Sequence, residues 1–144
     1  MREEDIEALL PLMGRYCDFY GVPSEDASLV AMSRALIADN LREGLQLIAR
    51  GDDGRAAGFA TIFWSWSTLA AARVGVMNDL YVEPGARGSG LADELINACV
   101  ERCRQRGDVI SLNWQTAKDN LRAQAVYERV GARRSEWVDY SLPV

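Results

Sequence analysis

The residues best suited to chemistry lie in one glycine-rich segment, 87–92, which reads Arg-Gly-Ser-Gly-Leu-Ala. A strand pattern leads into this segment, and a helical pattern starts directly after it. The first turn of a helix has backbone N–H groups without intrahelical partners, and the positive end of the helix dipole lies there. Gly88 and Gly90 allow the backbone to approach a bulky anion closely, and Arg87 can add a charge-assisted contact. The segment therefore predicts a phosphate-binding loop at the start of a helix.

Two common phosphate-binding fingerprints do not fit this loop. A dinucleotide fingerprint needs a third glycine after Gly88 and Gly90, at the position where this chain has Asp93. The P-loop of nucleotide-binding enzymes ends in Gly-Lys-Ser or Gly-Lys-Thr, which is absent. What remains is the pattern Arg-x-x-Gly-x-Ala, formed by Arg87, Gly90 and Ala92. A nucleotide-binding α/β enzyme is therefore disfavoured.

A second segment, 116–132, carries polar and small residues on a helical pattern. Asn120 stands where it can cap the helix or bind a ligand, and the sequence leaves both alternatives open. Tyr127 has a phenol that can act as a general acid. Its alternative role is packing in the core, because Ala123 and Val130 share its helical spacing.

Together the two segments resemble the GNAT superfamily of N-acetyltransferases. Residues 78–92 match its motif A, a strand followed by Gln/Arg-x-x-Gly-x-Gly/Ala and a helix. Residues 116–132 match a second motif with Thr, Asn, Ala, Tyr and Gly at fixed spacing, although Ala132 replaces the usual final aromatic residue. The similarity extends to the branch that includes polyamine and histone-tail acetyltransferases, through Asn-Asp-Leu-Tyr-Val and a terminal Tyr-Ser-Leu-Pro. It covers most of the chain, and two motifs in the right order are more specific than either alone.

The resemblance implies that an acetyl group passes from acetyl-CoA to a primary amine of a small molecule or peptide, by direct attack on the thioester and without a metal. The loop amides would hold the pyrophosphate, the backbone of Leu80 and Val82 would pair with the pantetheine arm, and Tyr127 would protonate the sulfur. The residues expected to bind the cofactor are Leu80, Tyr81, Val82, Arg87, Gly88, Ser89, Gly90, Leu91, Ala92, Asn120 and Tyr127. The alternative is a non-catalytic module that binds or senses acyl-CoA and could dispense with Tyr127.

The catalytic base is a separate question, because an alkylamine with a pKa of roughly 10 must lose a proton before it can attack. The chain has no histidine, which excludes Ser-His and Cys-His mechanisms and histidine-ligated zinc hydrolysis. The base is then a carboxylate or water. Asp79, in the strand beside the expected thioester, is the first candidate, and the alternatives are Glu83, Glu25, Asp26 and bulk water.

Several aromatic residues have two interpretations. Trp64, Trp66 and Trp114 could line an acceptor pocket and attract a cation through their ring faces. Trp64 and Trp66 share one side of a strand pattern, so a packed core or a dimer surface is the favoured interpretation for them. The same interpretation is favoured for Phe19 and Tyr20.

The elements that must position these residues follow from hydrophobic period and turn residues. The first helix is capped by Asp5, and Pro11 should kink it or move its regular part downstream. A second helix is capped by Ser24 or Ser28 and runs to about Asn40. Further helices are expected at 90–106 and 120–130, and strands at 45–50, 56–66, 74–83, 109–116 and within 137–142.

This order predicts an α/β protein with a mixed sheet and helices on its faces. The resemblance implies the GNAT fold, a mostly antiparallel mixed sheet whose fourth and fifth strands splay apart. Members of the superfamily usually begin with a strand before the first helix. This chain starts almost inside that helix, so its first strand is expected to be short or missing.

Composition and charge indicate how many domains the chain forms and which other classes of protein it does not resemble. A chain of 144 residues with 49% hydrophobic and 26% charged residues fits one globular domain, 1–144. Its net charge of −5 argues against nucleic-acid binding, and the weakly polar stretch 59–77 contains Arg73, so no membrane span is expected. Cys99 and Cys103 share one helix face and should be small buried hydrophobes. The polar N-terminus and the lack of a disulfide framework favour a cytoplasmic protein, and a homodimer is common in families of this kind.

Overall fold

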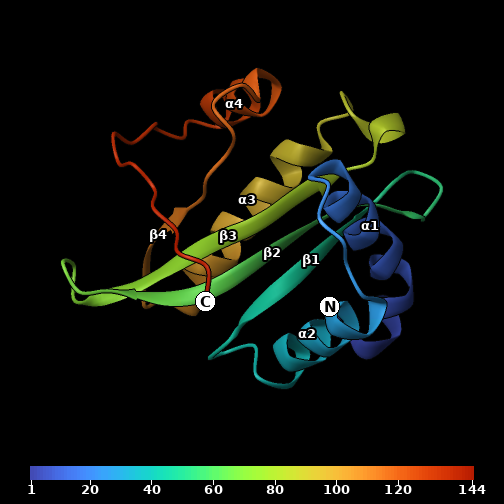
Figure 1. Cartoon of the computed structure of the whole chain (residues 1–144), viewed down its shortest axis with the longest axis horizontal. Coiled ribbons are helices and arrows are strands. Elements are labelled where there is room, and N and C mark those ends of the chain that lie inside the picture. Colours follow the sequence, from blue (N-terminus) through green and yellow to red (C-terminus); the bar gives the residue numbers. More distant parts are fainter.

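The computed structural model describes residues 1–144 and contains one four-stranded sheet flanked by helices (Figure 1). The helices are η1 (Glu3–Asp5), α1 (Ile6–Phe19), α2 (Asp26–Ala38), η2 (Pro84–Ala86), α3 (Leu91–Arg106) and α4 (Leu121–Arg129). The strands are β1 (Gly44–Arg50), β2 (Ala56–Ser67), β3 (Ala72–Val82) and β4 (Val109–Asn113). None of the helices combines the length and the apolarity that a bilayer crossing requires.

The sheet is mixed, and its strands lie in the order β1-β2-β3-β4. β1 pairs with β2 and β2 pairs with β3 in antiparallel fashion, whereas β3 and β4 are parallel. β4 pairs with β3 only along residues 73–76, so residues 77–82 of β3 have no strand beside them on that edge. The predicted fold class is confirmed: the sheet is mostly antiparallel, β3 and β4 are the splayed strands, and no strand precedes α1.

Two hydrophobic layers hold helices against opposite faces of the sheet. On one face α3 packs through residues such as Ile96 and Cys99 against Ile62 of β2. On the other face α1 packs through Leu12 against Phe59 of the same strand. Successive residues of a strand point to opposite faces, which is why β2 can serve both layers. Burying each such side chain contributes about 1.5–3 kcal/mol, so both helices are anchored by the sheet. The predicted burial of Cys99 and Cys103 on one face of α3 is confirmed.

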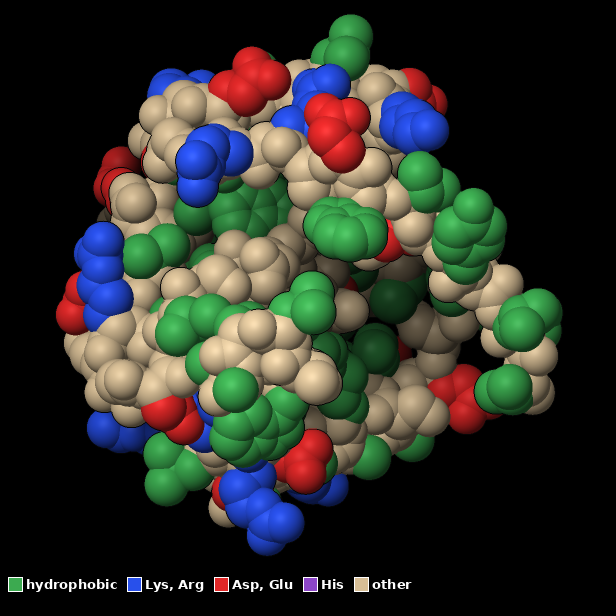
Figure 2. Space-filling view, turned by 90° about the vertical axis from the view of Figure 1, so that its left-hand side faces the viewer, with side chains coloured by type: hydrophobic (Ala, Val, Ile, Leu, Met, Phe, Trp, Pro, Cys, Tyr) green, Lys and Arg blue, Asp and Glu red, His purple; other side chains and the backbone are tan.

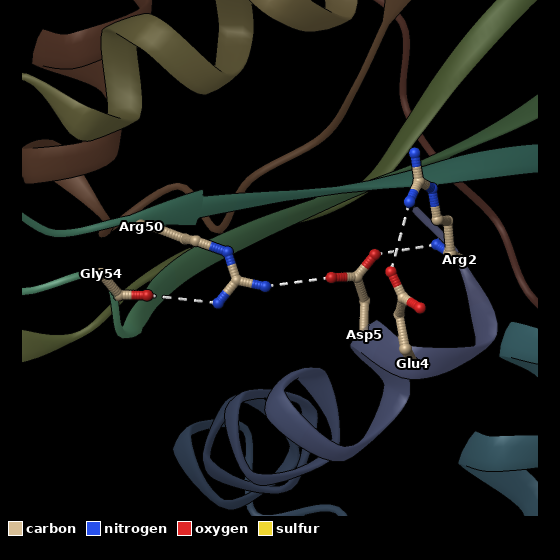
Figure 3. A network of polar contacts seen from close by, with 5 residues as sticks. All are labelled: Arg2, Glu4, Asp5, Arg50 and Gly54. Carbon is tan, nitrogen blue, oxygen red and sulfur yellow. Dashed lines mark hydrogen bonds and ion pairs between the residues drawn. The ribbon is translucent and has the colours of Figure 1, made fainter.

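The start of the chain differs in detail from the prediction. Asp5 lies at the N-cap of α1, but its carboxylate does not cap the helix. It accepts a hydrogen bond from the backbone N–H of Arg2 at 2.9 Å and pairs with Arg50 of β1 at 3.0 Å (Figure 3). Arg50 also donates to the carbonyl oxygen of Gly54, so this network ties the N-terminus to the β1–β2 turn.

The helix boundaries also correct two expectations. α1 runs from Ile6 to Phe19 with Pro11 inside it, so proline does not move the regular part of the helix downstream. α2 is preceded by Glu25 at the N-cap position, so neither Ser24 nor Ser28 caps it. Hydrophobic burial of α1 against the sheet outweighs the backbone hydrogen bond that proline removes.

The strand expected within 137–142 is not formed, and this prediction was wrong. β4 ends at Asn113, and its outer edge has no neighbouring strand. A strand without a partner leaves its N–H and C=O groups unpaired, so alternating apolar residues alone do not produce one. Trp137 and Tyr140 are instead 84% and 94% exposed. Figure 2 shows exposed hydrophobic side chains along a stretch of chain that is separated by a gap from the main body of the molecule.

Candidate active site

The loop that leads into α3 has the geometry of an anion cradle. Gly88 and Gly90 adopt φ angles of +88° and +94°, in the left-handed region that favours glycine. A Cβ atom at either position would meet nothing within 4 Å, so open space faces the loop. The backbone N–H groups of residues 88–92 donate to no acceptor within the chain. Five successive free donors at the positive end of a helix dipole can therefore converge on an anion.

Two side chains hold this loop in shape. The guanidinium Nε of Arg87 donates to the carbonyl oxygen of Val82 at 2.9 Å. The hydroxyl of Ser89 donates to the carbonyl oxygen of Ala86 at 2.7 Å. Both side chains are therefore engaged with the backbone that precedes α3. Their contacts brace the turn between β3 and the helix.

The strand before this loop presents a free backbone edge to the same space. Residues 77–82 of β3 have β2 on one side and no strand on the other. The side chains of Leu80 and Val82 pack into the α3 layer, while that of Tyr81 lies in the α1 layer. These three residues pack through their side chains. The backbone N–H and C=O groups on the free edge of β3 can therefore bind an extended ligand as a neighbouring strand would.

α4 closes the other side of this space. The Asn120 side chain caps it, because its Oδ1 accepts a hydrogen bond from the backbone N–H of Ala123 at 3.2 Å. Arg129 near the end of α4 donates to both carboxylate oxygens of Asp93 in α3, at 2.9 and 2.6 Å. These hydrogen bonds lower the pKa of Asp93, and the bidentate pair fixes α4 against α3.

Tyr127 of α4 points its aromatic ring into this region. The ring packs edge-on against Trp114, with centroids 5.3 Å apart, and Thr116 lies beside its hydroxyl. Burial raises the pKa of Tyr127 above its ordinary value of 10.0, so the phenol is neutral at physiological pH and can donate a proton. The two interpretations of Tyr127 therefore coexist, since one side of the ring packs and the residue also lines a cleft.

The loop, β3, α4 and α1 together enclose a cleft of about 360 Å³. One wall consists of residues 80–82 of β3, and Arg87 and Ala92 lie next to it. A second wall is α4, with Asn120 and Tyr127. The volume lies within the range of small-molecule sites, and most lining residues are hydrophobic.

The third wall is aromatic and comes from the end of α1. The sequence left an acceptor pocket open for Phe19 and Tyr20 but favoured packing, and it did not single out Tyr16. Tyr16 and Tyr20 pack edge-on with centroids 5.1 Å apart, and Phe19 packs on Tyr20 at 5.0 Å. All three line the cleft, and Phe19 is 60% exposed, so neither it nor Tyr20 belongs to the core. The three-residue spacing of two aromatic residues at the end of a helix was the signal available in the sequence.

The tryptophans lie elsewhere. Trp64 is buried, and its indole N–H donates to the carbonyl oxygen of Asn40 at 2.8 Å, which confirms the packed-core interpretation. Trp66 is exposed beneath the guanidinium of Arg73. Trp114 touches the cleft only through its contact with Tyr127.

Asp79 lies behind the aromatic wall, and a β-bulge places it there. Thr61 pairs with Asp79 and Ile62 pairs with Met77, so Asn78 is an extra residue in β3. The bulge reverses the alternation, with the result that Met77 faces α3 while Asp79 faces α1. Asp79 is only 9% exposed and does not itself line the cleft.

The surroundings of Asp79 make its carboxyl group a weaker acid than that of an ordinary aspartate. Burial raises its pKa above the ordinary value of 3.8, and hydrogen bonds from Thr61, Asn78 and Tyr16 oppose that rise only in part. The amide of Asn78 donates to its Oδ1 at 3.0 Å. No ion pair reaches the Asp79 carboxylate.

The other candidate bases are less suitably placed. Glu83 is engaged in an ion pair with Arg15 of α1. Glu25 and Asp26 lie at the exposed start of α2 and do not line the cleft. Of the four carboxylates considered, Asp79 alone is buried and contacts a residue of the cleft wall.

Comparison with known proteins agrees with this architecture. Residues 11–132 match the model of the acetyltransferase (GNAT) family. The uncharacterized N-acetyltransferase YhfO of Bacillus subtilis (strain 168) is 30% identical over 144 residues, which cover 99% of this chain and 94% of that protein.

Solved structures of acetyltransferases have the same fold. The crystal structure of a probable acetyltransferase is 31% identical, with a TM-score of 0.86 over 100% of this chain and 95% of that chain. The aminoglycoside N-acetyltransferase AAC(6')-Iy, in complex with CoA, is 23% identical with a TM-score of 0.81 over 99% of this chain and 91% of that chain. This last likeness concerns the fold alone.

Proposed function

Because the chain belongs to the acetyltransferase (GNAT) family and is an acyltransferase, we propose that it transfers an acetyl group from acetyl-CoA to a primary amine. The observation that carries this proposal is the run of free N–H groups at residues 88–92. Arg87, just before this run, and Ala92, at its end, line a cleft that also has an unpaired strand edge and a neutral phenol, and a buried carboxyl group lies behind its α1 wall.

The residues present fit the proposed donor. The free amides of residues 88–92 suit a pyrophosphate, because a helix N-terminus with left-handed glycines is a ready anion site. The unpaired edge of β3 suits the amide-containing pantetheine arm, which can bond to it as a neighbouring strand would. Asn120 retains a free side-chain N–H group at the cleft after capping α4 through its oxygen. Acetyl-CoA would supply the thioester as the electrophile.

Tyr127 is the proposed general acid. Its pKa is raised by burial, so it holds its proton until negative charge develops beside it. It lines the cleft beyond the unpaired edge of β3, on the wall formed by α4. The Trp114 ring and Thr116 fix its orientation, which reduces the entropic cost of positioning the proton.

Asp79 is the proposed base. A carboxylate with a raised pKa is a better proton acceptor than an ordinary aspartate, because base strength increases with the pKa of the conjugate acid. It is the only buried carboxylate that contacts the cleft wall among the candidates from the sequence. The alternatives, water or another carboxylate, predict that Asp79→Asn retains activity.

One experiment distinguishes an enzyme that acetylates amines from a module that binds acyl-CoA without turnover. The protein is mixed with acetyl-CoA and a panel of primary amines, and release of free thiol is followed with a colorimetric reagent. We expect amine-dependent thiol release. Micromolar CoA binding without release on any amine would favour the binding module.

Two further expectations concern assembly and location. We propose a homodimer, supported by the apolar segment 137–144, in which Trp137, Tyr140 and Leu142 are exposed. Light scattering coupled to size-exclusion chromatography tests this, and a monomer at micromolar concentration would contradict it. A cytoplasmic location is supported by three free cysteines, two of them buried, since thiols stay reduced there.

A further inference from the structure

A row of polar side chains crosses the α1 face of the sheet, in a layer that is otherwise apolar. Gln46 of β1, Thr61 of β2 and Asp79 of β3 are successive cross-strand partners. They are 2%, 0% and 9% exposed. Polar groups are rarely buried in a row within a sheet, because each one loses its hydration.

Hydrogen bonds of this row lead from Gln46 toward Asp79, and the Gln46 amide also donates to the sulfur of Met13 at 3.5 Å. The Gln46 amide donates to the Thr61 hydroxyl at 3.3 Å, which leaves the hydroxyl proton of Thr61 for the Asp79 carboxylate. Asn78 donates from the side at 3.0 Å. The amide oxygen of Gln46 has no partner, so the arrangement is kept although one buried acceptor is unsatisfied.

Tyr16 is the only member of this network that reaches the cleft. Its hydroxyl donates to the carbonyl oxygen of Asn78 at 3.5 Å and lies beside the Asp79 carboxylate. Its ring packs edge-on against Phe59, 5.8 Å away, which fixes the position of the phenol. Tyr16 therefore connects the cleft to the buried carboxyl group of Asp79.

The charge of the cleft limits what can enter it. The only charged side chains in its lining are Arg87 and Arg122, and no carboxylate lines it. Arg87 and the loop belong to the proposed donor side, whereas Tyr16, Phe19 and Tyr20 have no role there. A polycation would bring several ammonium groups against two guanidinium groups, and none of its extra charges would find a partner. The aromatic wall suits one ammonium group and an apolar body.

We propose that the α1 wall is the acceptor site, that it takes a primary monoamine with an apolar, preferably aromatic, body, and that Tyr16 relays the amine proton to Asp79. This inference rests on the proposed acetyl transfer and deepens it by naming the class of acceptor.

The proton steps balance. Tyr16 passes its phenolic proton to the Asp79 carboxylate and takes one proton from the substrate ammonium, which leaves a neutral amine. The amine lone pair then forms the N–C bond, and the C–S bond breaks with its electron pair on sulfur, which takes the Tyr127 proton. The remaining extra proton on nitrogen returns to the Tyr127 phenolate, and Asp79 releases its proton to solvent after the products leave.

The first test compares amines in the thiol-release assay. We expect kcat/KM for phenethylamine to exceed that for spermidine by at least about tenfold, because the extra ammonium groups of spermidine lack partners. Turnover of spermidine equal to or faster than that of phenethylamine would overturn the acceptor class while leaving the proposed function intact. Absence of turnover with every amine would instead count against the proposed function.

The acceptor site stays testable even without turnover. Phenethylamine is titrated by calorimetry into the protein saturated with CoA. We expect Phe19→Ala to weaken its binding roughly 2- to 12-fold, the range expected for an aromatic contact. Leu69→Ala, at a 96% exposed position in the β2–β3 turn, is the control and should leave binding unchanged. Absence of binding, or equal binding to the two variants, would overturn the site.

Tyr16→Phe tests the relay and keeps the ring packing. We expect kcat for phenethylamine to fall roughly 10- to 100-fold with KM within about twofold. Since Tyr16 is one of the donors that hold the Asp79 pKa down, the acid limb of the pH–rate profile should also move to higher pH. Tyr140→Phe, at a 94% exposed tyrosine, is the matched control. An unchanged kcat and acid limb in Tyr16→Phe would overturn the relay.

Discussion

Replacing Gly90 with alanine should destabilise the protein, because the loop before α3 requires a left-handed backbone at this residue. Gly90 has a φ angle of +94°, and a Cβ there would meet no atom within 4 Å, so the penalty is conformational rather than steric. An L-residue in the left-handed region costs about 1–2 kcal/mol. If the loop keeps its shape, Gly90→Ala should lose that much unfolding free energy, equivalent to roughly 3–8 °C in Tm.

Gly14→Ala is the matched control, because it makes the same chemical change with the opposite expected sign. Gly14 lies inside α1, and its added Cβ would also meet no atom within 4 Å. Alanine is favoured over glycine in a helix interior by about 0.5–1 kcal/mol, so this variant should be more stable than the wild type. Urea unfolding followed by tryptophan fluorescence measures both values.

The loop can also respond to Gly90→Ala by changing its conformation. If the loop relaxes instead of accepting a left-handed alanine, its free N–H groups no longer converge, and CoA affinity measured by calorimetry should fall by about tenfold for each 1.4 kcal/mol lost. Gly14→Ala should bind CoA as the wild type does. Wild-type stability together with wild-type CoA affinity in Gly90→Ala would contradict a left-handed backbone at residue 90.

Three further predictions follow from the same geometry. Tyr127→Phe should lower kcat roughly 10- to 100-fold with little change in CoA affinity, measured by steady-state kinetics and calorimetry; unchanged turnover would remove it from the mechanism. Asp79→Asn should raise Tm relative to the wild type, by an amount that is small near pH 4 and grows as the pH rises, because burial raises the Asp79 pKa above 3.8 and the folded protein loses stability as that carboxyl ionises. Thermal unfolding between pH 4 and roughly pH 8 checks the sign, and a gain that shrinks with pH would contradict it. Phe59→Ala should lose about 3–5 kcal/mol in urea unfolding, because this side chain is buried between α1 and the sheet; a loss below roughly 1 kcal/mol would mean that the α1 layer is not packed as described.

The sequence predicted those features whose cause is local. The strands expected at 45–50 and 56–66 and the helix expected at 90–106 depend on residues within each segment, and the structure has β1, β2 and α3 there. Gly88 and Gly90 shape the loop before α3 in the same local way. Strand 137–142 was mispredicted for the opposite reason. A strand depends on a partner edge that is distant in sequence, and alternation within the segment carries no information about that partner.

The polar row behind the cleft shows the same limit. Gln46 and Thr61 are lone polar residues within apolar strand patterns, which is visible in the sequence. Their alignment with Asp79 depends on the register of both hairpins and on the bulge at Asn78. Tyr16 joins them only because α1 packs on that face of the sheet. Tertiary register therefore places Asp79, the proposed base, whereas local sequence shapes the proposed phosphate-binding loop.

A crystal structure of the protein with CoA is the most direct test of the proposed donor site. We expect the pyrophosphate to lie within hydrogen-bonding distance of the N–H groups of residues 88–92, the pantetheine arm along the free edge of β3, and the sulfur beside the Tyr127 hydroxyl. A pyrophosphate bound away from the start of α3, or a sulfur out of reach of Tyr127, would contradict the account.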